Sequence, residues 1–211
     1  MDMEVALELA PTDGSPKRRQ IVAAAEQLFL AHGYGAVSMD AIARAARVSK
    51  ATLYAHFASK DALFAGIMAE RGSDNPIDSD LFAAEVDDVA GHLARIGQSV
   101  LRFMLRERTL SIYRVTMAES GRFPELGRVF YENGPQRFCN TFRAWLADQV
   151  AAGRLVAADP DLASHQFMAL LRSGVFLRAS LGLQPPPSTE EIDETVAAAV
   201  DTFLKAFGPT S

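Results

Sequence analysis

The stretch "VSKATLYAHFASK", residues 48–60, decides how the first third of this sequence folds. Its Ser49 can cap a helix, and Leu53 and Phe57 follow four residues apart, so both side chains face the same way. Ser59 can cap the helix that comes next. The pattern predicts a short helix that two apolar anchors hold against a small domain, with its polar side facing outward.

Helix signals continue on both sides of this stretch. Residues 15–32 open with Ser-Pro, an N-cap followed by proline at the first helical position, and predict a helix. Ser38 can cap a second, short helix, and a fourth is expected over residues 60–71. Two short helices joined by a tight turn, the second beginning with Ser49 and Lys50, have the helix-turn-helix form that inserts its second helix into the major groove of DNA.

The outward side of that second helix carries the residue types that contact DNA. Lysine supplies positive charge, and tyrosine and histidine can donate hydrogen bonds to phosphates. Alanine and threonine are small enough for the backbone to approach base edges, where a methyl group can meet thymine. Lys60 begins the next helix, where a cation and exposed N–H groups favour another phosphate. The groove-side candidates are Lys50, Ala51, Thr52, Tyr54, Ala55 and His56.

Charge is distributed unevenly along the chain. The formal net charge is −5, yet residues 16–60 hold seven bases and two acids, while the rest of the chain holds 14 bases and 24 acids. A polyanion would therefore dock against the first segment and be repelled by the remainder.

The residues after this segment predict a change of domain and then longer helices. Residues 72–80 are rich in Gly, Ser, Asp, Asn and Pro, which is typical of a linker. Apolar residues then recur at helical spacing, and no strand-like alternation or internal repeat is visible. The fold class is therefore predicted to be all-α. Long helices are expected over residues 81–107, 110–119, about 130–150, 162–181 and 190–207.

The segment "IVAAAEQLFLAHGYGAVSMDAIARAARVSKATLYAHFASKDALF", residues 21–64, resembles the DNA-binding domain of the TetR (AcrR-like) transcription regulators almost position by position. "MAESGRFPELGRVFYENGP", residues 117–135, more loosely resembles the AefR-like subgroup of regulatory domains. The first resemblance implies a small core of Ala43, Val48, Leu53 and Phe57. It also implies DNA contacts at Ser38, Ser49, Lys50, Thr52, Tyr54, His56 and Lys60.

Two positions depart from the family pattern. Arg47 replaces the glycine usual in the turn, and Ala51 stands where glycine is frequent. A positive φ at Arg47 would carry a modest strain, while its charge would lie beside the groove. We therefore include both residues among the predicted DNA contacts.

The resemblance implies that the second domain binds a small effector between its helices. Its aromatic and methionine side chains are individually typical of a core, yet together they permit a pocket that suits a hydrophobic or aromatic compound. One of five helical arginines, at positions 102, 106, 143, 172 and 178, could anchor an acidic effector, and the sequence does not single one out. The predicted ligand-binding residues are Phe103, Met104, Tyr113, Met117, Phe138, Phe142, Trp145, Phe167 and Leu171.

The last two expected helices carry wide apolar faces, more than a monomer would expose. The resemblance implies that two helices from each subunit form a four-helix bundle across a two-fold axis. The alternative is that these faces belong to the internal core. The predicted dimerisation residues are Leu170, Val175, Val196, Val200 and Phe203.

The sequence offers no catalytic, cofactor or metal site. A single cysteine, Cys139, cannot form an internal disulfide, and the four histidines lack metal-binding spacing. Cys139 and His165 fall on different predicted helices without an acid partner, which favours a buried structural thiol over a nucleophile. No stretch is long enough to span a bilayer, and the acidic N-terminus is unlike a signal peptide, so we expect a cytoplasmic protein.

Together these features predict a disordered acidic tail (residues 1–15), a helix-turn-helix DNA-binding domain (16–71) and a helical effector-binding and dimerisation domain (72–211). The predicted function is that of a homodimeric repressor, and not an enzyme, which a small hydrophobic or aromatic effector releases from a palindromic double-stranded DNA operator. The runner-up hypothesis is an α-helical small-molecule-binding or enzymatic domain whose N-terminal hairpin contacts a protein. Only the first predicts DNA affinity that falls steeply with salt.

Overall fold

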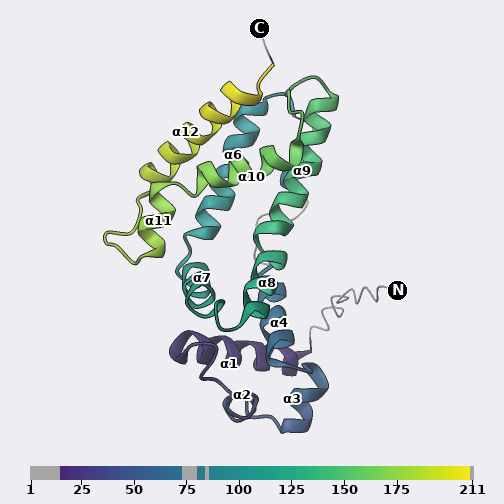
Figure 1. The fold of residues 1–211 in the computed structure, drawn as a ribbon, viewed down its shortest axis with the longest axis vertical. Helices are drawn as coiled ribbons and strands as arrows, with labels where there is room; N and C mark the ends of the chain where they lie inside the picture. The colour runs from purple at the N-terminus through teal and green to yellow at the C-terminus, as the bar shows by residue number, and fades with distance from the viewer. Residues whose placement is uncertain (1–14, 73–79, 84–85, 210–211) are drawn as a thin grey trace. The chain divides into compact units, whose positions relative to one another are not determined.

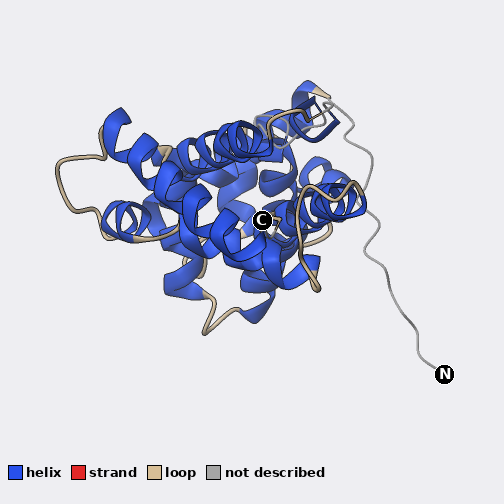
Figure 2. Ribbon diagram, turned by 90° about the horizontal axis from the view of Figure 1, so that it is seen from above, coloured by secondary structure: helices blue, strands red, loops and turns tan. Residues whose placement is uncertain are grey.

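The computed structural model describes residues 15–72, 80–83 and 86–209. Throughout these ranges the regular structure is α-helical (Figure 2), which confirms the predicted all-α class. The expected acidic tail and most of the expected linker lie outside the described residues. The chain forms two compact units, residues 1–69 and 70–211.

The N-terminal unit contains three helices, of which two are short, and the first part of a fourth (Figure 1). Each begins behind a serine whose Oγ atom accepts a hydrogen bond from the backbone N–H three residues later, and Ser15, Ser38, Ser49 and Ser59 are these caps. All four serine caps predicted from the sequence are thus confirmed. The helices are α1 (Pro16–His32), α2 (Met39–Ala45), α3 (Lys50–His56) and α4 (Lys60–Gly72).

A compact aromatic core holds these helices together. Phe29 and Tyr34 lie with ring centroids 5.0 Å apart, and Phe64 from α4 packs on both. Leu53 and Phe57, the two predicted anchors of α3, are buried in the same unit. Burying each such side chain contributes about 1.5–3 kcal/mol, so the anchors are sufficient to fix the orientation of a seven-residue helix.

The C-terminal unit is a bundle in which α12 lies along α6, and α10 packs against both α9 and α12 (Figure 1). Its core is rich in aromatic side chains from α9, α10 and α12. The helices are α5 (Asp80–Ala83), α6 (Val89–Met104), α7 (Glu107–Glu119), α8 (Pro124–Asn133), α9 (Pro135–Ala151), α10 (Pro160–Leu171), α11 (Gly174–Ser180) and α12 (Thr189–Phe207).

Three of the long predicted helices are shorter than expected. Asp88 caps α6 by accepting a hydrogen bond from the Gly91 N–H, so residues 81–107 do not form one helix. Gly134 and Pro135 separate α8 from α9. Ser173 takes an extended ψ of −168° and separates α10 from α11. The last helix agrees with the prediction, because Ser188 and Glu191 form a reciprocal capping box at its start.

Most of the predicted dimerisation residues are buried within one chain, and the contact between α6 and α12 accounts for part of this burial. A Cβ atom at Gly97 would lie 2.9 Å from Val196 Cγ1 and 3.2 Å from Leu171 Cδ2, so glycine lets the two helices approach closely. The apolar face of α12 is consequently covered within one chain. Val175, Val196, Val200 and Phe203 are buried core residues, whereas Leu170 is partly exposed.

Candidate nucleic-acid interface

The turn between α2 and α3 has the hydrogen-bond pattern of a Schellman motif. The Val48 N–H donates to the Ala43 carbonyl at 3.0 Å, and the Arg47 N–H donates to the Arg44 carbonyl at 3.1 Å. This motif places the first residue beyond the C-cap in the left-handed region. Arg47 accordingly has φ 50°, where the side chain of any non-glycine residue is disfavoured. Arg47 therefore has the positive φ that its position in the turn led us to consider.

The outward face of α3 is polar and exposed. The side chain of Lys50 is 66% exposed and Tyr54 is 51% exposed. Ala51 and Ala55 are also exposed, whereas Thr52 and His56 are half-buried. Because Leu53 and Phe57 point inward, these side chains form one continuous surface strip on the N-terminal unit.

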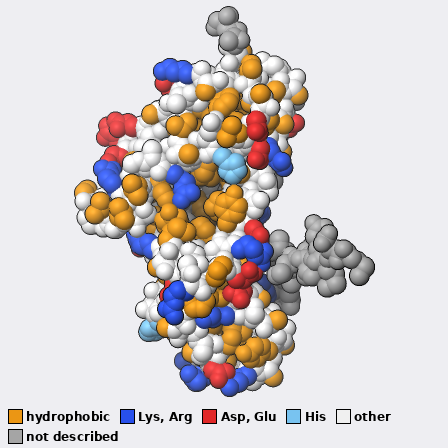
Figure 3. Space-filling view, viewed as in Figure 1, with side chains coloured by type: hydrophobic (Ala, Val, Ile, Leu, Met, Phe, Trp, Pro, Cys, Tyr) orange, Lys and Arg blue, Asp and Glu red, His pale blue; other side chains and the backbone are white. Residues whose placement is uncertain are grey.

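Lys50 is paired with an acid in the unbound unit. Its Nζ atom lies 2.6 Å from Oδ2 of Asp40, which belongs to α2. The side chains are 66% and 43% exposed, so the pair is weakly stabilising and salt would screen it. Figure 3 shows Lys and Arg side chains gathered on this unit around α2 and α3, with an acidic side chain among them. Lys50 can therefore exchange its carboxylate partner for a phosphate at small cost.

The two serine candidates accept hydrogen bonds from the backbone, and the Thr52 hydroxyl pairs with that of Ser49. Ser49 Oγ and Thr52 Oγ1 lie 2.8 Å apart, and Ser49 also caps α3. Ser38 caps α2 and is exposed. Each hydroxyl remains able to donate or accept a further hydrogen bond.

Lys60 has a structural role that the sequence did not indicate. Its ammonium donates to the backbone carbonyls of Tyr34 at 2.8 Å and Val37 at 3.0 Å, and it lies 4.3 Å from the centroid of the Tyr34 ring. The Tyr34 hydroxyl in turn donates to Oδ1 of Asp61 at 2.5 Å. These contacts tie the start of α4 to the loop between α1 and α2. If Lys60 also contacts a phosphate, as predicted, it must do so beside these hydrogen bonds to backbone carbonyls.

Arg18 and Gly66 support α3 from behind, and neither was among the predicted site residues. The guanidinium of Arg18 lies 4.9 Å from the centroid of the Phe57 ring. A Cβ atom at Gly66 would lie 2.6 Å from Phe57 Cε1, so only glycine leaves room for this ring. The glycine inside an otherwise helical pattern was the available signal, because such a residue often marks close packing.

In the C-terminal unit, the predicted ligand-binding residues fall into two groups. The first group is buried, and its aromatic rings pack on one another in the core. Phe142 lies 4.9 Å from Phe167 and 5.6 Å from Trp145, measured between ring centroids. The second group is nearer the surface, and Met117 is 51% exposed. The buried group is Phe138, Phe142, Trp145, Phe167 and Leu171, and the partly or largely exposed group is Phe103, Met104, Tyr113 and Met117.

Cys139 and His165 come together although their helices are far apart in sequence. The Cys139 Sγ atom lies 3.6 Å from His165 Nδ1, and His165 Nε2 lies 3.9 Å from Asp161 Oδ2. Burial raises the pKa of the Cys139 thiol, and a hydrogen bond from Ser164 opposes this only in part. The thiol is therefore kept protonated, which agrees with a structural role and not with a reactive nucleophile.

Within the described residues no cluster of three or more His, Cys, Asp or Glu side chains could hold a metal ion. The described helices also include none that is both long and apolar enough to cross a membrane.

The fold and the α2–α3 geometry define a helix-turn-helix regulator with a separate helical domain. Residues 21–67 match the family described as bacterial regulatory proteins, tetR family, and residues 91–209 match the AefR-like transcriptional repressor C-terminal domain. The chain belongs to the TetR family of transcriptional regulators, with an AefR-like C-terminal domain. Both resemblances seen in the sequence are thus confirmed.

Solved structures and curated relatives agree with this assignment. The Flavonoid-responsive Regulator FrrA is 37% identical with a TM-score of 0.80, and the match covers 92% of this chain and 98% of FrrA. An uncharacterised HTH-type transcriptional regulator of Mycobacterium tuberculosis is 26% identical over 92% of this chain and 89% of its own length. UidR of Escherichia coli is 39% identical over 59 residues, so this match spans 28% of the chain and only 30% of UidR.

Proposed function

We propose that this regulator is a homodimeric repressor that leaves a palindromic DNA operator when a small hydrophobic or aromatic effector binds its C-terminal unit. It acts in the cytoplasm, where the chromosome is accessible, and its function is regulatory and not enzymatic. The observation that carries the proposal is the surface of α3. Two buried anchors hold this capped helix so that its charged and small side chains face away from the core.

The proposed DNA-contacting residues lie on α3 and at the edges of its turn. Lys50 and Tyr54 project most fully, and phosphates or base edges are the partners that suit them. Arg47 adds a cation at the turn. The remaining proposed contacts are Ser38, Ser49, Ala51, Thr52, His56 and Lys60.

A shallow groove on the exposed side of α10 and α12 supports the dimer proposal. It has a volume of about 460 Å³, and Leu170, Phe203 and Phe207 contribute its larger apolar side chains. Small or polar residues make up most of the rest, which lets helices of a second subunit approach closely. This surface keeps Leu170 and Phe203 from the predicted dimerisation residues, whereas the three valines of that set are buried within one chain. The other lining residues are Gln166, Ala169, Ser173, Thr202 and Ala206.

The effector proposal is supported by aromatic side chains and by one relative. Tyr113 lies between Phe130 and Phe176, at centroid distances of 6.1 Å and 5.2 Å. A flat aromatic compound is the ligand class that such rings favour. FrrA, the 37% identical structural neighbour, is named as responsive to flavonoids, which are aromatic compounds. Effector binding would release DNA by changing the separation of the two recognition helices in the dimer.

Genome-wide capture of DNA on the purified protein tests the proposal and yields the operator. Affinity for the recovered site should fall with salt along a log-log slope of about 0.9 per neutralised phosphate.

Lys50→Ala and Tyr54→Ala should each weaken binding while the helical content and the dimer are retained. Lys60→Ala is a poor test by itself, because it also removes the carbonyl contacts at the start of α4.

Failure of the proposal would take either of two forms. Recovery of no preferred site, or affinity independent of salt, would favour the hypothesis of a protein-contacting hairpin. Operator affinity that stays constant at every concentration of all compounds in a broad aromatic library would exclude release by an effector.

A further inference from the structure

The five arginines considered as effector anchors have different surroundings in the structure. Arg102 pairs with Asp193 at 3.0 Å, Arg178 pairs with Glu191, and Arg143 lies 3.9 Å from Asp161. Arg106 lies 5.5 Å from the centroid of the Phe103 ring. Only Arg172 is half-buried, and among the described residues it has no carboxylate partner.

Arg172 instead lies over two aromatic rings. Its guanidinium carbon is 4.9 Å from the centroid of Phe176 and 5.6 Å from that of Tyr113. The two rings pack edge to face, 5.2 Å apart. Ring faces compensate only part of the hydration that a half-buried cation gives up. An anion placed beside Arg172 would compensate for the rest of the hydration that the guanidinium loses.

Two buried polar atoms of the C-terminal unit also have no hydrogen-bond partner among the described residues. One is Oγ1 of Thr116, which is fully buried on α7 one helical turn after Tyr113. The other is Nε1 of Trp145. Buried hydroxyl and indole groups are nearly always hydrogen-bonded, so such exceptions indicate a place where a ligand or water supplies the missing partner.

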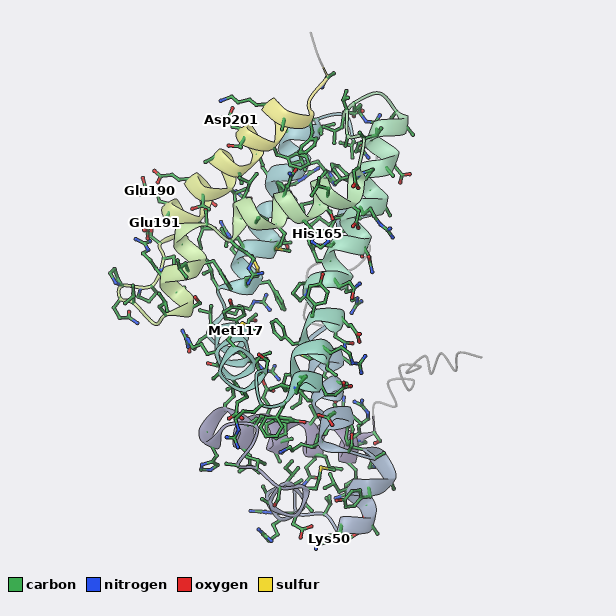
Figure 4. The ribbon with its side chains drawn as sticks, viewed as in Figure 1. Lys50, Met117, His165, Glu190, Glu191 and Asp201 are labelled. Carbon is green, nitrogen blue, oxygen red and sulfur yellow. The ribbon has the colours of Figure 1, made fainter. Side chains whose placement is uncertain are left out.

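One face of the C-terminal unit is hollowed. Figure 3 shows a depression with hydrophobic side chains inside it and a basic side chain at its rim. In the same view, Figure 4 places His165 above the depression and Met117 below it. A concave, mostly apolar site with a few polar groups is the usual form of a small-molecule pocket.

We infer that the effector is an aromatic compound bearing a carboxylate or comparable acidic group, and that Arg172 binds this group while Tyr113 and Phe176 contact the ring. The inference rests on the proposed effector response, and it adds the chemical class of the effector and the residue that binds its acidic group. A planar guanidinium can bind a carboxylate through two parallel hydrogen bonds, which an amide in the same position cannot match.

Calorimetric titration with matched acid and amide pairs tests the inference. The probes are 4-hydroxybenzoate, 4-hydroxycinnamate and 2-naphthoate, each compared with its primary amide, on the purified full-length protein without DNA. At least one acid should bind about tenfold or more tightly than its amide, as expected for a charge-assisted contact. Arg172→Gln should reduce that acid to the affinity of its amide.

Arg178→Gln is the matched control, because it removes the same charge from an exposed, paired arginine on the next helix. It should retain the preference for the acid. The inference is overturned if amides bind the unsubstituted protein as tightly as acids, if Arg172→Gln keeps the preference, or if no acid binds at millimolar concentration. The acid and amide comparison needs no variant, so it remains decisive if Arg172→Gln fails to fold. Since no DNA is present, failure of operator binding would be recognised separately.

Discussion

The ammonium of Lys50 and the carboxylate of Asp40 lie 2.6 Å apart, so a proposed DNA-contacting cation on α3 is held by α2 until DNA arrives. Binding to a phosphate requires this pair to separate. The acid thus competes with DNA, and it also repels the phosphate backbone.

Asp40→Asn is therefore expected to strengthen operator binding about two- to fivefold, in line with the small free energy of an exposed ion pair. The gain should shrink at high salt, where both effects are screened. Fluorescence anisotropy with labelled operator measures it. Asp201→Asn provides the control, since Asp201 forms an equally short exposed pair with Lys205 on α12. An equal gain from both variants would show that only net charge matters.

Arg47 is expected to be the strained residue of the α2–α3 turn. Gly153 and Gly182 occupy the left-handed position after α9 and α11, with φ 70° and φ 72°, whereas Arg47 holds φ 50° with a side chain. Arg47→Gly should therefore be more stable than Arg47→Ala by about 1 kcal/mol in urea unfolding, because alanine keeps the strain. Both variants lose the same charge and should lose operator affinity equally. Equal stability of the two variants would show that the turn carries no strain.

Gly66→Ala should weaken DNA binding without touching the DNA-facing surface. The new methyl group would collide with the Phe57 ring, which anchors α3, and overpacking of this kind costs about 1–3 kcal/mol. Thermal unfolding and operator affinity should both decrease. Gly174→Ala is the matched control, because a Cβ atom there meets nothing within 4 Å. If the two variants behave alike, Phe57 is not held by this contact.

His92 predicts a pH dependence of stability. The ring is buried, its Nε2 lies 2.6 Å from the Leu81 carbonyl, and it stacks on Trp145 with centroids 5.2 Å apart. Burial lowers its pKa from the ordinary 6.5; the hydrogen bond to Leu81 opposes this, and repulsion from Arg95 adds to it. The unfolded chain thus takes up a proton near pH 6.5, and the folded chain only at lower pH.

The stabilisation from neutral His92 is consequently complete above pH 6.5 and is lost as pH falls from there through the folded-state pKa. Urea unfolding between pH 5 and 7.5 should show this loss, with a slope of at most about 1.4 kcal/mol per pH unit. His92→Gln should be less stable at neutral pH but flatter across the range. His32→Gln, at an exposed site on α1, should keep the slope of the unsubstituted protein. A slope unchanged in His92→Gln would assign the pH dependence to other groups.

Features that depend on neighbours in sequence were predictable. The serine caps, the capping box at Ser188 and the inward direction of Leu53 and Phe57 all follow from hydrogen bonds or side-chain positions within one or two turns. Helix breaks were less predictable. The interruptions at Gly134 and Ser173 occur within apolar patterns that would also suit one continuous helix, since periodicity alone does not register a change of helix direction.

The sequence by itself determined the helix-turn-helix, its exposed face, the aromatic composition of the second unit and the family. Only the tertiary structure decided which apolar face is covered within the chain, because Gly97 lets α6 approach Val196 across a long sequence separation. It likewise distinguished Arg172 from four other helical arginines. Caps and anchors arise from local geometry, whereas burial and the pairing of charges depend on which distant segment lies opposite, and no local pattern contains that information.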